Sequence, residues 1–362
     1  MSRRQVLIGL ASTGLAGLAG CTGAPAGDVG TPTPTPSPTP SERSTPNSNP
    51  EARFAEVYER TIDSVAMVQT FGRFGPIGQG SGFVFRSDHL LTNEHVINGG
   101  TDVELQFPNN HWTTGEIIGA DPYSDLAVVR ADDLPTSATP LEPSQHRATI
   151  GQEVLALGNP FGLQESVSKG IVSGRNRSLP TGTGFSIPAT IQTDASVNPG
   201  NSGGPLVTLD ARYLGVITAR AGQDIGFAVS WRLAERVAPN LLEDGSYEHP
   251  YMGVTLQRVT PPIAEANDLA SVTGVIVVDV IPGDPAEGTL EGSPDETTVR
   301  GITVPVGGDV IVALDDVEIA TDEELSTYLA LHTRPGDSID VTVIRDGERR
   351  TVTFELGNRP AP

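Results

Sequence analysis

The chain has 362 residues, a formal net charge of −22 and a single lysine, Lys169. So acidic a composition disfavours nucleic acids and anionic membrane surfaces as electrostatic partners. The length exceeds that of one ordinary core and predicts two domains with additional segments. The 41 glycines and only 5% aromatic residues favour short strands and turns over helical bundles.

The acidic excess extends along the whole chain and allows two interpretations. A solvated acidic surface that aids solubility is the ordinary one. The replacement of almost all lysine by arginine indicates instead an adaptation to concentrated salt, where a Debye length of about 3 Å at ~1 M screens the repulsion between carboxylates. We therefore predict that folding and activity require strong salt.

Residues 1–21 have the composition of an export signal rather than of a folded segment. Ser2-Arg3-Arg4-Gln5-Val6-Leu7 is a twin-arginine pattern, and the apolar run Val6–Ala19 is shorter than the ~20 residues of a membrane-spanning helix. The only cysteine, Cys21, follows this run and resembles a lipobox cysteine. A lone thiol can stay free, bridge two chains or carry a lipid. Its position favours the lipid, so we expect twin-arginine export and a lipid anchor on the outer face of the cell membrane.

Residues 22–50 are rich in proline, threonine and serine, with Thr31-Pro32-Thr33-Pro34-Thr35-Pro36 at their centre. Such a composition cannot bury a core and favours extended polyproline II. At about 3.1 Å per residue, this linker could hold the following domain up to ~90 Å from a membrane surface.

Residues 51–246 predict a mainly β domain. The spacing of Phe54, Val57 and Tyr58 predicts a short helix that ends near Ile62, and no long helix follows before Trp231. The short alternating runs between them fit a pair of six-stranded antiparallel barrels. The first set is Ser64–Thr70, Gly82–Phe85, Val103–Phe107 and Leu126–Arg130, and the second is Glu153–Leu157, Ser166–Val172, Ala189–Gln192, Leu206–Thr208, Tyr213–Thr218 and Gly226–Val229.

Three short motifs carry the candidate chemistry. Gly200-Asn201-Ser202-Gly203-Gly204-Pro205-Leu206 sets a serine among glycines, whose backbone freedom lets N–H groups converge where negative charge develops. A serine nucleophile needs a base and an orienting acid, and both lie upstream. His95 follows a β-rich run, and Asp125 heads an apolar strand. The order histidine, aspartate, serine is that of chymotrypsin and not of subtilisin or the α/β hydrolases.

Each of these residues has an expected role. We expect Ser202 to be the nucleophile, His95 the general base and Asp125 the group that orients the imidazole. The N–H groups of Gly200 and Ser202, with Asn201 between them, are expected to form an oxyanion hole.

The motifs resemble those of the HtrA/Deg family of serine proteases, T-N-x-H-V, S-D-[LI]-A and G-N-S-G-G, and the similarity extends from Phe54 to Pro360. Glu94 stands where the family often has asparagine. The resemblance implies a chymotrypsin-like double barrel over residues 51–246, with trypsin-like serine endopeptidase activity on misfolded extracytoplasmic proteins. It also implies a homotrimer and neither a cofactor nor a metal, in a chain exported as a haloarchaeal type of lipoprotein.

A second interpretation stays open, in which the protein is a chaperone or peptide-binding scaffold whose protease domain is latent or inactive. A glycine-rich turn around a serine, a lone histidine and a strand-leading aspartate each occur without catalysis. Labelling by a fluorophosphonate probe separates the two interpretations.

Two departures from digestive relatives bear on activation and specificity. Asn201 is uncharged, so it cannot form the ion pair by which the residue before the nucleophile holds a newly cut amino terminus. Ser196 stands where a trypsin-like pocket has an acid, which favours cleavage after small or medium aliphatic residues. The expected pocket walls are Ile217, Thr218 and Ala219. The loops expected to regulate the oxyanion turn are Phe71–Gly80, Ser173–Ser186 and Arg220–Gly226.

Residues 247–360 predict a PDZ domain, after a helix over Trp231–Glu243 that ends at Gly245. Tyr251-Met252-Gly253-Val254 resembles the loop by which family PDZ domains hold a peptide's carboxyl terminus with backbone N–H groups. An ordinary strand opening with a glycine is the alternative. The acidic insertion Glu287–Pro305 is longer than usual. The segments that follow in PDZ order are Gly274–Val280, Pro282–Ala286, Gly308–Ile311, the helix Asp322–Leu331 and Ser338–Arg345.

Overall fold

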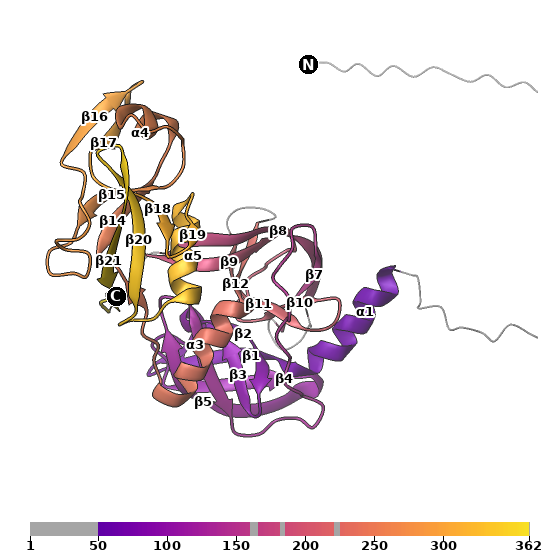
Figure 1. Ribbon diagram of the computed structural model, residues 1–362. Coiled ribbons are helices and arrows are strands. Elements are labelled where there is room, and N and C mark those ends of the chain that lie inside the picture. Colours follow the sequence, from indigo (N-terminus) through magenta and orange to yellow (C-terminus); the bar gives the residue numbers. More distant parts are fainter. Residues whose placement is uncertain (1–49, 160–165, 182–184, 221–224, 362) are drawn as a thin grey trace, which may run out of the picture. The chain divides into compact units, whose positions relative to one another are not determined.

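The computed structural model describes residues 50–159, 166–181, 185–220 and 225–361 (Figure 1). The predicted export signal with Cys21 and nearly all of the linker lie outside these residues. The helices are α1 (Pro50–Thr61), α2 (Glu94–Ile97), α3 (Trp231–Asp244), α4 (Pro261–Ala266) and α5 (Asp322–His332), with 3-10 turns η1 (Ile62–Ser64) and η2 (Pro108–Asn110). No helix in the described ranges is long and apolar enough to cross a bilayer.

The strands fall into two groups along the chain. The first group is β1 (Val65–Gly72), β2 (Gly75–Arg86), β3 (His89–Thr92), β4 (Asp102–Phe107), β5 (His111–Asp121), β6 (Leu126–Ala131), β7 (Glu153–Gly158), β8 (Ser166–Pro180), β9 (Ser186–Thr193), β10 (Pro205–Thr208), β11 (Tyr213–Arg220) and β12 (Gly226–Ser230). The second is β13 (Pro250–Tyr251), β14 (Val254–Arg258), β15 (Val275–Val280), β16 (Asp295–Val299), β17 (Ile302–Val306), β18 (Val310–Leu314), β19 (Val317–Glu318), β20 (Ser338–Arg345), β21 (Glu348–Glu355) and β22 (Gly357–Asn358).

The first twelve strands close into two antiparallel barrels, in the orders β1-β2-β3-β6-β5-β4 and β10-β11-β12-β9-β8-β7. Alternate side chains of each strand point inward. Val84, Leu105 and Val129 are fully buried in the first barrel, and Leu206 and Leu214 are fully buried in the second. The predicted pair of six-stranded barrels is confirmed.

Two strands of the first barrel were not predicted. β3 has only four residues, too few to show an alternation of apolar and polar side chains. β5 buries only Gly119 and Asp121 and leaves its other residues half-buried or exposed, so its sequence lacks a regular apolar face. Pairing with β6 on one side and β4 on the other satisfies its backbone groups.

The expectation that Phe71–Gly80 is a loop is wrong for most of that segment. β1 and β2 pair through it, from Gln69 opposite Gln79 to Gly72 opposite Gly75. The glycines that suggested mobility lie here in a regular antiparallel hairpin. Ser173–Ser186 is likewise largely strand, because β8 continues to Pro180 and pairs with β9. Most of Arg220–Gly226 lies outside the described residues.

The helix predicted after the barrels is confirmed as α3. Ser230 caps its start by accepting a hydrogen bond from the Leu233 N–H at 3.5 Å. Gly245 ends it in the left-handed conformation, with φ of 74° and its N–H bonded to the Leu241 carbonyl. Leu233 and Val237 on its buried face pack into the core cluster that also receives side chains of both barrels.

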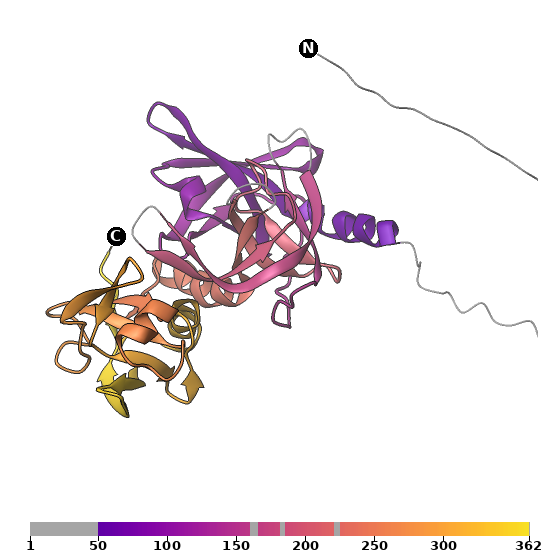
Figure 2. The ribbon, with the colours of Figure 1, turned by 90° about the horizontal axis from the view of Figure 1, so that it is seen from above.

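The elements from β14 onward form a second body, coloured orange and yellow in Figure 2. A six-stranded sheet runs in the order β14-β15-β18-β20-β21, with β19 paired to β18. α5 begins at Thr321, whose hydroxyl accepts from the Glu324 N–H at 3.1 Å, and Leu325 and Leu329 pack into the core of this body. The acidic insertion contains the β16–β17 hairpin.

Candidate active site

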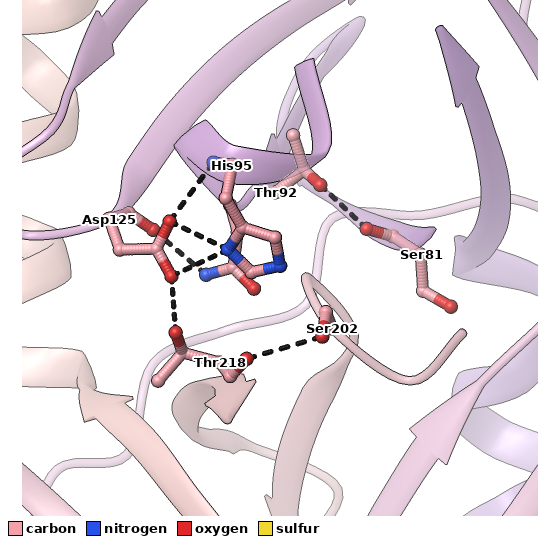
Figure 3. Close-up of polar contacts among 7 residues, drawn as sticks. Ser81, Thr92, His95, Asp125, Ser202 and Thr218 are labelled. Atoms are coloured by element: carbon pink, nitrogen blue, oxygen red, sulfur yellow. Dashed lines mark hydrogen bonds and ion pairs between the residues drawn. The ribbon is translucent and has the colours of Figure 1, made fainter. Parts of the chain in front are cut away.

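His95 and Asp125 come together in the first barrel. His95 lies in α2 directly after β3, and Asp125 immediately precedes β6, which pairs with β3. The imidazole Nδ1 is 2.9 Å from each carboxylate oxygen of Asp125, and the His95 backbone N–H donates to Oδ1 at 3.1 Å (Figure 3). This geometry fixes the ring orientation and leaves Nε2 free to meet a third group.

Asp125 is held from three sides. Its backbone adopts φ of 54°, an uncommon conformation for a residue other than glycine. The side-chain amide of Asn93 donates to the Asp125 carbonyl at 2.8 Å, and the Thr218 hydroxyl donates to Oδ2. Sequence reasoning had assigned Thr218 to a pocket wall and missed this contact. Only the placement of β11 against the first barrel reveals it.

The charges around His95 favour its protonated form. Burial by itself would lower the pKa of His95, but the hydrogen bond and charge of Asp125, with the charge of Glu94, outweigh it and raise that pKa. The pKa of Glu94 is also raised, first by burial and then by the charge of Asp125. Glu94 thus adds negative charge beside an imidazole that has to accept a proton.

Ser202 lies in a turn of the second barrel between Gly200, at φ of 97°, and Gly203, at φ of 86°. Its hydroxyl donates to the Thr218 carbonyl at 3.2 Å, and no hydrogen bond joins it to His95 within the described residues (Figure 3). Ser202 and Asp125 nevertheless contact the same residue, Thr218, through its two oxygens. The structure therefore brings the three motif residues around one threonine.

The N–H groups of Gly200 and Ser202 donate to no partner in the part of the chain that the structure describes. They are available to a negatively charged oxygen. The side chain of Asn201, which lies between them, is fully buried, and neither its oxygen nor its nitrogen has a hydrogen-bond partner among these residues.

Ser81 ties the nucleophile turn to the first barrel, a contact that sequence reasoning missed. Its N–H donates to the Ser202 carbonyl at 2.7 Å, and its hydroxyl donates to the Gly200 carbonyl at 2.6 Å. The hydroxyl also accepts from the Asn159 N–H at 3.0 Å. A Cβ on Gly203 would lie 2.0 Å from the Ser81 carbonyl oxygen, so the turn requires glycine there for space as well as for conformation.

The predicted peptide-binding loop Tyr251–Val254 lines a cavity of about 290 Å³ together with apolar side chains of α5 such as Leu325 and Leu329. Gly253 has φ of 77°, which lets successive N–H groups turn toward one side. The side chain of Met252, within this loop, is buried in the core of the second body. The cavity therefore has walls from a strand and a helix, the elements between which an added peptide strand binds, and Ser186 and Pro188 of β9 line it as well.

No group of three or more histidine, cysteine, aspartate or glutamate side chains suited to a metal ion is found in the described ranges.

Comparison with known proteins agrees with this geometry. Residues 80–216 match the trypsin-like peptidase domain family and residues 250–356 the PDZ domain family. A probable periplasmic serine endoprotease DegP-like from Pseudomonas fulva is 34% identical over 318 residues, covering 85% of this chain and 62% of the relative. The chain thus spans less than two thirds of the length of that curated relative.

Two solved structures are similar over nearly their whole length. The HtrA-type protease AlgW with tripeptide has a TM-score of 0.69 and 32% identity, covering 85% of this chain and 98% of that one. The serine endoprotease from Yersinia pestis has a TM-score of 0.60 and 27% identity, again covering 85% and 98%.

Proposed function

Because the chain belongs to the family of HtrA-type proteases, we propose that it is a serine endopeptidase that hydrolyses unfolded or misfolded extracytoplasmic proteins. The observation that carries this proposal is the His95–Asp125 pair on one barrel and the glycine-flanked Ser202 on the other, both in contact with Thr218. We assign residues 51–246 to the protease domain and 247–360 to a PDZ domain.

The proposed reaction begins with a change of the Ser202 rotamer, from the Thr218 carbonyl toward Nε2 of His95. His95 takes the hydroxyl proton as Ser202 attacks the peptide carbonyl, and Asp125 stabilises the resulting imidazolium. The N–H groups of Gly200 and Ser202 bind the oxyanion, a contribution of about 3 to 4 kcal/mol per donor in other proteases. His95 then protonates the leaving amine, and water releases the acyl group.

A comparison of wild type with Ser202→Ala tests the proposal. Wild type in strong salt should react with a fluorophosphonate probe and hydrolyse unfolded casein, and the variant should do neither. A wild type that is not labelled but suppresses aggregation of an unfolded protein would contradict the proposal and favour the chaperone or scaffold.

The specificity pocket we propose is lined by Ile217, which is fully buried, and lacks an acid at Ser196. Small or medium aliphatic residues should therefore precede the cleaved bond. A peptide library with every residue at that position would contradict this if arginine or lysine were preferred.

The groove lined by Tyr251–Val254 is proposed to bind apolar carboxyl termini of peptides. Its support is the cavity lined by this loop and α5, together with the tripeptide and the decapeptide that accompany the related HtrA-type protease AlgW in its structures. Fluorescence anisotropy with a labelled apolar peptide should show tighter binding of the free carboxylate than of the same peptide amidated. Equal affinities would contradict carboxylate recognition.

Export and anchoring are proposed from residues 1–21 and the linker 22–50. The twin arginines and Cys21 support a lipid anchor outside the cell membrane, and the related protein from Pseudomonas fulva is named periplasmic. Cys21→Ser should release the protein from the membrane fraction into the medium. Arg3→Lys with Arg4→Lys should retain it inside the cell.

Two further properties of the whole protein are proposed. The net charge of −22 with one lysine supports a requirement for strong salt, so the thermal midpoint and activity should rise from dilute buffer to molar salt. Full activity in dilute buffer would contradict it. Family membership supports a homotrimer, which light scattering would distinguish from a monomer.

A further inference from the structure

A second histidine–aspartate pair, this one buried, lies at the turn that precedes Asp125. Nε2 of His249 is 2.8 Å from Oδ2 of Asp121, and the two side chains are only 6% and 3% exposed. Asp121 is the last residue of β5, and His249 directly precedes β13. Because a carboxylate only accepts hydrogen bonds, Nε2 is the donor.

Asp121 organises the turn that presents Asp125. Oδ1 accepts from the Tyr123 N–H at 3.2 Å. Oδ2 accepts from the Ser124 N–H at 3.1 Å and from the Ser124 hydroxyl. Asp125 follows at φ of 54°, so its unusual conformation is set by a turn wound around one buried carboxylate. A buried carboxylate is costly unless its oxygens are satisfied, and His249 supplies the donor that comes from outside the turn.

Asp121 also acts on the site electrostatically. Burial is the main cause of the raised pKa of Glu94, and the charges of Asp125 and Asp121 add to it. The turn and the catalytic carboxylate therefore share one electrostatic environment.

His249 is held on its other sides by the carboxyl-terminal segment and by aromatic rings. Its carbonyl accepts from the Arg359 N–H at 2.9 Å, next to the pairing of Pro250 with Asn358. The imidazole meets the rings of Tyr247 and Tyr123 edge to face, with centroids 4.7 and 5.3 Å apart.

Arg359 also contacts Tyr123, one of the two aromatic residues that pack against His249. Its guanidinium lies 5.0 Å from the ring centroid of Tyr123 and 4.9 Å from that of Phe185. The hydroxyl of Tyr123 donates to the Pro360 carbonyl. The β13–β22 pair and the Asp121–Asp125 turn are thus joined by backbone, aromatic and charged contacts that meet at His249.

We propose that His249 is a positioning residue for the proteolytic reaction, acting through Asp121 to set the orientation of the Asp125 carboxylate. On this proposal the β13–β22 pair holds His249 in place, and His249 in turn holds Asp121 and the turn that orients Asp125. This inference rests on the proposed protease function, and it assigns to His249 no contact with the substrate.

The test compares His249→Leu with His249→Gln in the full chain. Leucine fills much of the space without donating, whereas the glutamine amide can reach the position of Nε2 and donate to Asp121. His249→Leu should lower kcat for a short peptide roughly ten- to a hundredfold with KM nearly unchanged, since a buried charged acceptor loses its donor. His249→Gln should restore most of the rate.

The pH dependence of kcat/KM separates a positioning role of His249 from a purely structural one, because a purely structural role would leave the pKa of His95 unchanged. Asp125 raises the pKa of His95 by its hydrogen bond and charge, so loosening Asp125 should lower that pKa. The acid limb of kcat/KM should therefore move to lower pH in His249→Leu and return in His249→Gln. His89→Leu, which breaks the His89–Asp88 pair on the other end of β3, is the matched control and should change neither quantity.

Unchanged kcat and an unchanged acid limb in folded His249→Leu would overturn the proposal. If that variant does not fold, His249→Asn replaces it, because its amide is too short to reach Asp121. A rate in His249→Asn equal to that of His249→Gln would then overturn the proposal, and a selective loss would support it. Absence of turnover in wild type would instead contradict the protease function, a result distinguishable from either.

Discussion

The two halves of the active site differ in how completely they are assembled. In the first barrel, Asp125 receives hydrogen bonds from His95, Asn93 and Thr218, and the acid–base pair is in contact. In the second barrel, the Ser202 hydroxyl is bonded to a carbonyl instead of to His95. Strand pairing thus brings the charged pair together, with one further bond from Thr218 across the barrels, whereas the nucleophile depends on its rotamer and on the contacts that Ser81 makes with its turn.

Asp125→Asn should break the assembled half most completely. An asparagine holds the imidazole in the wrong tautomer, so we expect kcat to fall about 10⁴-fold while the fold is retained. Steady-state hydrolysis of a peptide substrate, with thermal unfolding alongside, measures both. Asp133→Asn, at an exposed aspartate 3.3 Å from His111, is the control, and an equal loss there would show that the effect is not specific to the triad.

Thr218→Val should separate the two halves, because Thr218 contacts both. Valine keeps the shape but removes the hydroxyl donor to Asp125 and leaves the carbonyl that holds Ser202. A hydrogen bond to a charged group contributes about 1.5–3 kcal/mol, so kcat should fall roughly ten- to a hundredfold. Thr190→Val, at a buried threonine bonded to the Arg177 carbonyl, should leave the rate unchanged. A full rate in Thr218→Val would mean that the other donors suffice.

Ser81→Ala should weaken only the second half. The variant loses the hydroxyl bond to the Gly200 carbonyl and the bond that the hydroxyl accepts from the Asn159 N–H, but keeps the backbone bond to Ser202. Only the bond to Gly200 holds the nucleophile turn directly, and one neutral hydrogen bond contributes about 1 kcal/mol, so we expect a loss of a few fold in the acylation rate. The rate of fluorophosphonate labelling measures it. If the pKa of His95 is unchanged, the acid side of the pH profile of kcat/KM will not move. That result would confine the effect of the substitution to the turn that holds Ser202.

Glu94→Gln should give the smallest effect, a shift in the pH dependence of kcat/KM that arises in the His95–Asp125 half of the site. His95 must be neutral to act as a base, and its raised pKa means that activity is lost as pH falls through a value above the ordinary one. Removing the negative charge of Glu94 removes one cause of that rise, so the acid limb of kcat/KM should move to lower pH. Glu116→Gln, at an exposed glutamate paired with Arg130, is the control. A shift to higher pH would contradict the assignment.

The sequence was sufficient to predict those features that depend on short local patterns of residues. Short peptides around His95, Asp125 and Ser202 were enough to locate the candidate residues, and the segment that ends at Gly245 was enough to locate α3. Strand β5 could not be predicted because apolar and polar residues do not alternate in its sequence, HWTTGEIIGAD.

The supporting contacts could not be predicted because each joins residues far apart in the chain. Thr218 and Asp125 are 93 residues apart, Ser81 and Gly200 are 119 apart, and His249 and Asp121 are 128 apart. No spacing in the sequence encodes such pairs, since they arise only when folded units dock. Glycine content also misled the prediction at Phe71–Gly80, where pairing between neighbouring strands prevails over the flexibility of single residues.

The bonds from Ser81 to the Gly200 and Ser202 carbonyls have a consequence for newly made protein. The acid and base come from one barrel and the nucleophile from the other, and these bonds form only after the barrels have met. On the proposed mechanism, a chain in which only one barrel has folded lacks part of the catalytic set and should not cut its neighbours. Because the proposed catalytic residues are divided between the two barrels, a newly made chain should stay inactive until both barrels have folded and packed together.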